Sequence, residues 1–366
     1  MLAGPVARCA SAASSPHVEQ KGGLCPLADC TDVVTEEELA QSPAWFPLEL
    51  VRDDAVRLVY LDEAAYRAAS FLDQRLLQCR YEQTTCTLAC ARSVAARLVD
   101  STDYIFHIGH VGSTLISRLL GEHERIFSLR EPALLRAAAH EPPNGAADLE
   151  VTVRLLSRTW RPDRRPLVKA TSIVSELAER LLGAEHEPAA VLMYSTPLAY
   201  LQCILGGPVS RAESKVLAAP RRRRLIRRLG PEWRWDPRSE GQWIAMNWLT
   251  EMSALHQAAA RFPSRVLWVN FDTFLQQPLE GLRAMFQQLG VEVGSSEVEA
   301  LVSGPITRQY SKGPEHAYDA ALRREVLKYA EWEHGPEIRR GMDWLAAVAR
   351  ANPVAQSVLD SASRLQ

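Results

Sequence analysis

An apolar run that leads through a glycine-containing loop into a helix constrains this chain more than any other feature. Residues 104–108, YIFHI, have the pattern of a buried strand, and residues 113–121 have the apolar spacing of an amphipathic helix. Unpaired N–H groups at a helix start, the positive end of the helix dipole and flexible glycines together favour a bound oxyanion. The predicted phosphate- or sulfate-binding residues are Gly109, His110, Val111, Gly112, Ser113 and Thr114. A ligand-free turn capped by Ser113 is the alternative.

Alternating strand and helix patterns follow this loop and indicate a mostly parallel sheet. Further apolar strands are expected at residues 167–170, 190–194 and 266–271. The predicted class is α/β, a three-layer sandwich with its ligand crevice at the carboxyl ends of the strands. Helices are expected at 113–121, 133–139, 148–159, 174–184, 197–205, 240–261, 279–289, 319–330 and 335–350.

The part of the chain before this sheet has a different pattern. A strand at residues 56–61 is followed by helical spacing at 62–77 and 87–99, which predicts a small N-terminal α+β section. The expected divisions are a mobile tail at 1–36, the N-terminal section at 37–100, the main domain at 101–350 and a C-terminal tail at 351–366.

Charge and cysteine content narrow the class of protein. A net charge of -2 gives no global reason to expect nucleic acid as a partner. The chain has no run of 18 apolar residues, so we expect no membrane-spanning helix. Seven scattered cysteines without a clear signal peptide favour reduced thiols and a cytoplasmic location. Cys86 and Cys90 could place two metal ligands on one helical face, but no second pair completes a site. We therefore expect no metal.

Lysine is scarce in this chain, which draws attention to one position. Of the 42 basic residues only Lys21, Lys169, Lys215, Lys312 and Lys328 are lysines, and the rest are arginines. Lys169 lies at the end of an apolar strand, where a solvated surface role fits poorly. An ammonium at that place would offset the negative charge of a bound oxyanion.

The segment GHVGSTLISRLLGEHERIFSLREP, residues 109–132, resembles the 5′-phosphosulfate loop of the P-loop sulfotransferases. In motif order it is closest to the tyrosylprotein and heparan-type branches, and looser matches extend the resemblance over about residues 103–315. The resemblance implies transfer of a sulfuryl group from 3′-phosphoadenosine 5′-phosphosulfate (PAPS) to a hydroxyl or amine acceptor, without a metal. It does not identify the acceptor or the oligomeric state.

The resemblance also implies roles for individual residues. Glu131 falls at the position of the catalytic base, and Lys169, in VKATS, at that of a lysine that stabilises the transition state. Ser311, in Tyr310-Ser311-Lys312-Gly313, matches a late segment that contributes a hydroxyl to the reacting sulfate. From the residues alone, Glu131 could instead be an acid at a helix start before Pro132.

Two positions depart from the family pattern. His110 stands where the family has Lys or Arg, and a bound dianion would favour its protonated form. Ser195 and Cys203 occupy the places of the Arg and Ser that hold the donor's 3′-phosphate. A substitute cation could come from Arg211 or from the run 221–224.

The arginine run has its own alternatives. PRRRRLIRRLGPEWRW, residues 220–235, could bind a polyanion through arginines and through Trp233 and Trp235. Its repeated Arg-Arg-Leu also fits an ordinary helix with inward leucines and a solvated basic face, which we favour. Nucleic acid is accordingly not an expected partner.

Two other functions remain open. The departures at 110 and 195 are compatible with a non-catalytic phosphate- or nucleotide-binding regulatory protein on the same scaffold. A divergent phosphotransferase or NTPase is the other, although Ser113 stands where the GxxxxGK[ST] motif has its lysine. Asp272, after the strand at 266–271, is the one modest candidate for its metal-binding carboxylate.

Overall fold

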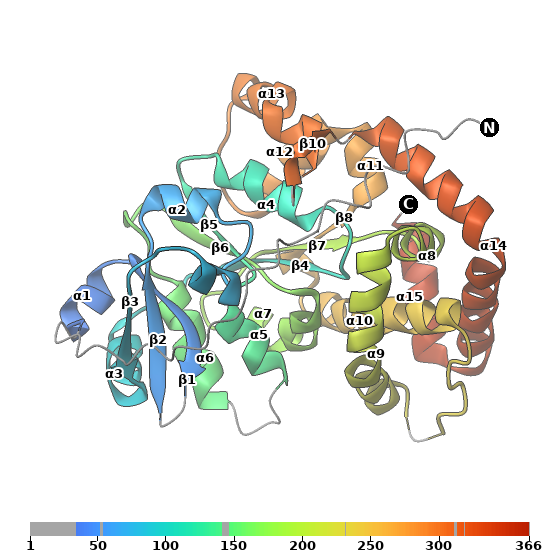
Figure 1. Cartoon of the computed structure of the whole chain (residues 1–366), viewed down its shortest axis with the longest axis horizontal. Helices are drawn as coiled ribbons and strands as arrows, with labels where there is room; N and C mark the ends of the chain where they lie inside the picture. The colour runs from blue at the N-terminus through green and yellow to red at the C-terminus, as the bar shows by residue number, and fades with distance from the viewer. Residues whose placement is uncertain are drawn as a thin grey trace, which may run out of the picture.

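A five-stranded parallel sheet forms the centre of the molecule, in the order β5-β6-β4-β7-β8 (Figure 1). The structure, a computed structural model, describes residues 34–51, 54–140, 146–230, 232–310, 313–317 and 319–365. The strands are β4 (Asp103–His107), β5 (Ile126–Arg130), β6 (Arg165–Lys169), β7 (Ala190–Tyr194) and β8 (Val266–Asn270). Parallel register throughout confirms the predicted α/β class.

Helices cover both faces of this sheet, as burial of parallel strands on both sides requires. In Figure 1, α4 and α12 lie on one side of the sheet and α5, α7 and α10 on the other. The helices of the main domain are α4 (Ser113–Gly121), α5 (Ala133–His140), α6 (Ala146–Leu156), α7 (Ala178–Leu182), α8 (Pro197–Leu205), α9 (Pro208–Leu229), α10 (Glu240–Arg261), α11 (Phe271–Gln276), α12 (Pro278–Gln288), α13 (Ser295–Ser303), α14 (Ala320–Ala351) and α15 (Pro353–Arg364). The 3-10 helix η4 (Ser172–Leu177) precedes α7.

The two helices expected near the C-terminus lie on either side of a kink within α14. Residues 320–351 form α14, with a kink at His334, where φ is -116° and ψ is 17°. Pro336 explains the kink, because its ring clashes with the preceding turn and it has no N–H to donate. The helix continues beyond the kink because its buried face still packs on α8 and α10.

The N-terminal section is a three-stranded antiparallel sheet with short helices, seen at the left of Figure 1. Its elements are α1 (Glu36–Gln41), β1 (Trp45–Val51), β2 (Ala55–Tyr60), α2 (Glu63–Ala68), η2 (Gln74–Gln78), β3 (Gln83–Thr87) and α3 (Leu88–Arg97). The expected continuous helix at 62–77 is wrong: α2 ends at Ala68. Leu72 instead forms two backbone hydrogen bonds with the chain around Glu131, to the Arg130 carbonyl and from the Ala133 N–H.

The chain termini contain one further departure. Within the segment expected as a C-terminal tail lies α15, which buries Ala355, Val358 and Ala362 in the core. The expected N-terminal tail falls almost wholly on residues 1–33, outside the described residues. Along the described ranges, no helix combines the length and the apolar character that a membrane span requires.

Candidate functional site

The loop between β4 and α4 has a backbone that only certain residues can adopt. Gly109, His110 and Gly112 have φ values of 91°, 56° and 64°, in the left-handed region. A Cβ on Gly112 would lie 2.0 Å from the ring of Phe271, so this position has room only for glycine. Gly112 is also the N-cap of α4 and makes no side-chain cap hydrogen bond. Ser113 is therefore not the cap of this helix, contrary to that part of the ligand-free alternative.

Beside this loop, three residues far apart in the sequence meet. The Lys169 ammonium donates a hydrogen bond to Thr114 Oγ1 at 3.2 Å and pairs with Glu131 Oε1. Parallel register explains the meeting, because Arg130 pairs with Lys169 across β5 and β6 and Ile105 pairs with Lys169 across β4 and β6. The ends of the strands thus bring Glu131, Lys169 and the start of α4 to one edge of the sheet.

Burial makes the Lys169–Glu131 pair energetically demanding. The Lys169 side chain is 1% exposed and that of Glu131 is 12% exposed. Removing either partner from such a pair leaves an uncompensated buried charge, which costs roughly 3–5 kcal/mol. The Phe71 ring, from the N-terminal section, lies 5.5 Å from the ammonium and adds a cation–π contact. The site thus holds a buried cation and a carboxylate next to the loop that favours an anion.

The His110 side chain lies toward α9. Its Nδ1 is 3.3 Å from Ser210 Oγ and its Nε2 is 3.5 Å from Glu213 Oε2. Ser210 and Glu213 are three residues apart and so share one face of the helix. A carboxylate therefore lies beside the position where the family pattern has a basic residue.

Cys203, on α8, contacts the same loop, and Ser195 directly follows β7, which pairs with β4. The Ser195 hydroxyl is buried and has no hydrogen-bond partner among the described residues, whereas its carbonyl accepts from Trp248 Nε1 at 3.0 Å. Cys203 Sγ donates to the carbonyl of His110 at 3.9 Å. An unpaired buried hydroxyl is uncommon in folded proteins and has capacity for one more polar contact.

Arg211 and Arg221, two of the arginines considered as substitute cations, are engaged by carboxylates. Arg211 donates to both Glu240 oxygens, at 2.8 and 2.6 Å. Arg221 donates to Glu251 at 2.6 Å and to Ser172 Oγ at 3.0 Å. Each guanidinium is thus held by side chains of the same molecule.

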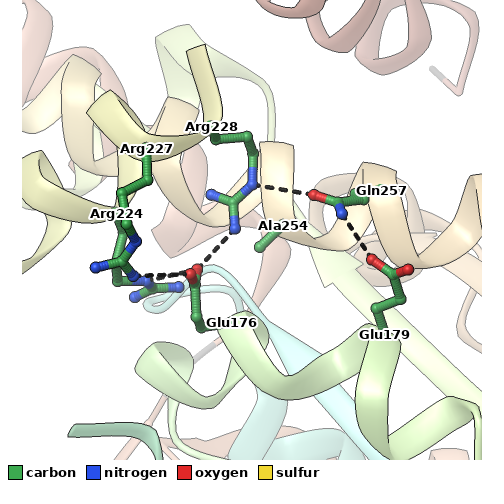
Figure 2. Close-up of a pocket in the computed structure, with 7 residues that line it drawn as sticks. All are labelled: Glu176, Glu179, Arg224, Arg227, Arg228, Ala254 and Gln257. Atoms are coloured by element: carbon green, nitrogen blue, oxygen red, sulfur yellow. Dashed lines mark hydrogen bonds and ion pairs between the residues drawn. The ribbon is translucent and has the colours of Figure 1, made fainter. Parts of the chain in front are cut away.

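The rest of the arginine run forms an ion-pair network in which Arg221 and Arg224 share the buried Glu251. Burial opposes ionisation of Glu176, but Arg224 and Arg228 outweigh it and lower its pKa to about 2. The expected solvated basic face is therefore wrong for these arginines. Figure 2 shows the adjoining cavity, of about 410 Å³, lined by Glu176, Glu179, Arg224, Arg227, Arg228, Ala254 and Gln257.

Asp272 and Ser311 are the two remaining candidates from the sequence. Arg323 donates to both carboxylate oxygens of Asp272 and lies over the Phe271 ring at 4.8 Å. Asp272 is thus paired with a cation. Ser311 lies outside the described residues. Within those that are described, no cluster of three or more His, Cys, Asp or Glu side chains could hold a metal ion.

No protein-family model and no curated protein sequence matches this chain. Three solved structures with a similar fold are sulfotransferases. A domain from the curacin biosynthetic pathway is 12% identical, covering 65% of this chain and 98% of its own, with a TM-score of 0.40. The sulfotransferase of Alicyclobacillus acidocaldarius is 14% identical, over 68% and 95%, at 0.36. Mouse SULT7A1 complexed with PAP is 11% identical, over 72% and 89%, at 0.38. Similarities this distant do not establish an activity or a substrate for this chain, so any proposal must rest on the residues of its site.

Several residues around the site carry no motif and were missed from sequence. Phe71 and Glu213 come from segments that reach the site only through tertiary packing. Arg130 did carry a signal, because a charged side chain interrupts the apolar stretch IFSLR directly before Glu131. Such an arginine in a buried strand needs a specific set of partners.

Proposed function

We propose that this chain transfers a sulfuryl group from PAPS to a hydroxyl or amine acceptor. The observation that carries the proposal is the meeting of Lys169, Glu131 and Thr114 beside the loop at 109–114. A buried cation and a carboxylate thus lie next to the turn to which we assign anion binding. Sulfuryl transfer requires a group of each kind.

Each group has a defined task in this proposal. The loop amides bind the 5′-phosphosulfate, and Glu131 accepts the proton of the acceptor hydroxyl or amine as its oxygen or nitrogen attacks sulfur. The bond between sulfur and the bridging oxygen breaks, and Lys169 stabilises the charge left on the phosphate. The products are the sulfated acceptor and 3′-phosphoadenosine 5′-phosphate (PAP).

The donor's 3′-phosphate is the weaker part of the fit. Ser195 offers an unpaired hydroxyl, but Arg211, Arg221 and Arg224 are bound to Glu240, Glu251 and Glu176. Each missing hydrogen bond to a charged group costs roughly 1.5–3 kcal/mol. We therefore expect this chain to prefer PAP over adenosine 5′-phosphate only weakly.

Calorimetry with PAP, followed by a turnover assay, tests the proposal. The wild-type chain should bind PAP and release it from PAPS in the presence of a suitable phenol, alcohol or amine from a panel. Glu131→Gln should bind PAP at least as tightly as the wild-type chain, because it removes a negative charge beside Lys169, and should lose turnover by about a hundredfold or more, the range of general-base catalysis. Absence of PAP binding by the wild-type chain would overturn the proposal.

A non-catalytic nucleotide-binding role is the second candidate, favoured by the Glu213 carboxylate beside His110. It predicts PAP binding with no turnover for any acceptor in the panel. The NTPase alternative is less well supported, because Arg323 already pairs with Asp272. Magnesium-dependent ATP hydrolysis would revive it. The cytoplasmic location stays a prediction.

A further inference from the structure

Two buried arginines fasten the N-terminal section to the main domain, and both bind main-chain carbonyls. Arg130, at the end of β5, donates to Ala69 O at 2.7 Å, to Arg67 O at 2.9 Å and to Tyr66 O. Arg158, after α6, donates to the carbonyls of Leu39, Ser42, Trp45 and Leu155 at 2.6–3.0 Å. Burial lowers the pKa of each guanidinium to about 10. Burying a guanidinium costs free energy, which the hydrogen bonds to these carbonyls offset.

Only one of these arginines lies next to the site. Arg130 directly precedes Glu131, whose φ of 54° is unusual for a residue with a side chain. The Arg130 carbonyl accepts from Leu72 N–H at 2.7 Å, and the Leu72 carbonyl accepts from Ala133 N–H at 3.0 Å. These two bonds lie on either side of Glu131. On the opposite side, Glu131 N–H donates to Lys169 O at 2.7 Å.

The same short segment also contacts the Lys169 ammonium and the helix of the phosphate loop. Phe71 lies over the ammonium, and the Arg75 guanidinium lies 3.5 Å from the centre of the Phe71 ring. Arg118, on α4, donates to Ser70 Oγ at 2.7 Å. Residues 69–72 thus lie between α4 and the ends of β5 and β6.

We propose that Arg130 is a positioning residue for Glu131, and that residues 69–72 are part of the catalytic site. This inference rests on the proposed function of Glu131. The Arg130 guanidinium holds the carbonyls at the end of α2 and so fixes the segment that leads from α2 to Leu72. The backbone hydrogen bonds of Leu72 in turn fix the left-handed turn that directs Glu131 to Lys169. A displacement of about 1 Å at such a carboxylate is enough to cost about a hundredfold in rate.

Arg130→Met and Arg158→Met form a matched pair for the test, because both remove a buried guanidinium that holds carbonyls of the N-terminal section. One readout is acetylation of Lys169 by acetic anhydride, measured by mass spectrometry with Lys215 and Lys328 as internal references. The other is the release of PAP from PAPS with water as acceptor, separated into kcat and KM. Both variants should lose thermal stability.

Only Arg130→Met should raise Lys169 acetylation, by about fivefold or more, and lower kcat by about tenfold or more, with KM for PAPS within about threefold. Equal acetylation in the two variants, or an unchanged kcat in Arg130→Met, would overturn the inference. Should Arg130→Met fail to fold, Ser70→Ala removes only the Arg118 contact and should raise Lys169 acetylation more than Arg158→Met does. A wild-type chain that binds no PAP defeats the proposed function, whereas the acetylation comparison still decides whether Arg130 positions the pair.

Discussion

At the scale of single residues, the carboxylate beside His110 sets the charge that an incoming phosphate meets. Glu213 Oε2 lies 3.5 Å from His110 Nε2, next to the loop. Glu213→Gln removes a negative charge there, so PAP should bind about threefold to tenfold more tightly at low salt, and the gain should shrink as salt screens the charge. Isothermal calorimetry at two salt concentrations measures it.

Glu297→Gln is a matched control for this change. Glu297 Oε1 lies 3.6 Å from His123 Nε2, near the far end of α4 from the loop. This variant should leave PAP affinity unchanged. Weaker binding by Glu213→Gln would contradict the expectation and would mean that the carboxylate holds His110 in place for the donor.

The sequence predicted single residues where the local pattern itself carried the constraint. Gly109 and Gly112 have the left-handed backbone that an anion-binding loop needs, and Lys169 lies at a strand end beside Glu131. Glu213 was missed, because only the turn between α8 and α9 brings it close to the loop, and the sequence did not predict that turn's geometry. The roles of Glu131, Lys169, Ser195 and Cys203 in binding or catalysis stay predictions.

At the scale of elements, the arginines of α9 fix this helix to η4 through the half-buried Glu176 and to α10 through the buried Glu251. Glu176 has a lowered pKa, so its ion pairs stabilise the fold above its usual value of 4.5 and lose that effect as pH falls toward about 2. Glu176→Gln should therefore lower the free energy of unfolding at pH 7 by roughly 3 kcal/mol, with a smaller difference near pH 3. Urea unfolding at both pH values measures this.

Glu179→Gln is the control on the same cavity. The Glu179 carboxylate accepts a hydrogen bond from the Gln257 amide rather than from a guanidinium. Its loss should cost less than about 1.5 kcal/mol at pH 7. Equal effects of the two variants would contradict an ion-pair origin for the stability of α9.

Elements were predictable where periodicity was long and unbroken, as in α8 and α10, whose expected bounds of 197–205 and 240–261 match the structure. β5 was missed because Ser128 and Arg130 interrupt its short apolar run. The helix expected over 62–77 was wrong because the Leu72 backbone pairs with Arg130 and Ala133, and the Ala69 carbonyl accepts from the Arg130 guanidinium. Tertiary hydrogen bonds outweighed local propensity there.

At the scale of the whole molecule, the N-terminal section shares the core of the main domain. Phe46, Leu48, Val59 and Leu61 belong to the same buried cluster as the strands of the parallel sheet. A chain that begins at residue 101 would expose that surface and leave Arg130 and Arg158 without their carbonyls. It should show no cooperative thermal transition by calorimetry, in contrast to the full chain. A sharp transition would mean that residues 101–350 fold independently.

The arginines that join the N-terminal section to the main domain also affect the order of folding during synthesis. The ribosome synthesises the N-terminal sheet before the main domain. The Leu39 carbonyl accepts a hydrogen bond from Arg158, which is synthesised 119 residues later. The N-terminal sheet is thus completed by a residue that is synthesised later. A product that stalls before residue 158 presents an unfinished sheet with open edges, the kind of surface that chaperones retain and that otherwise aggregates.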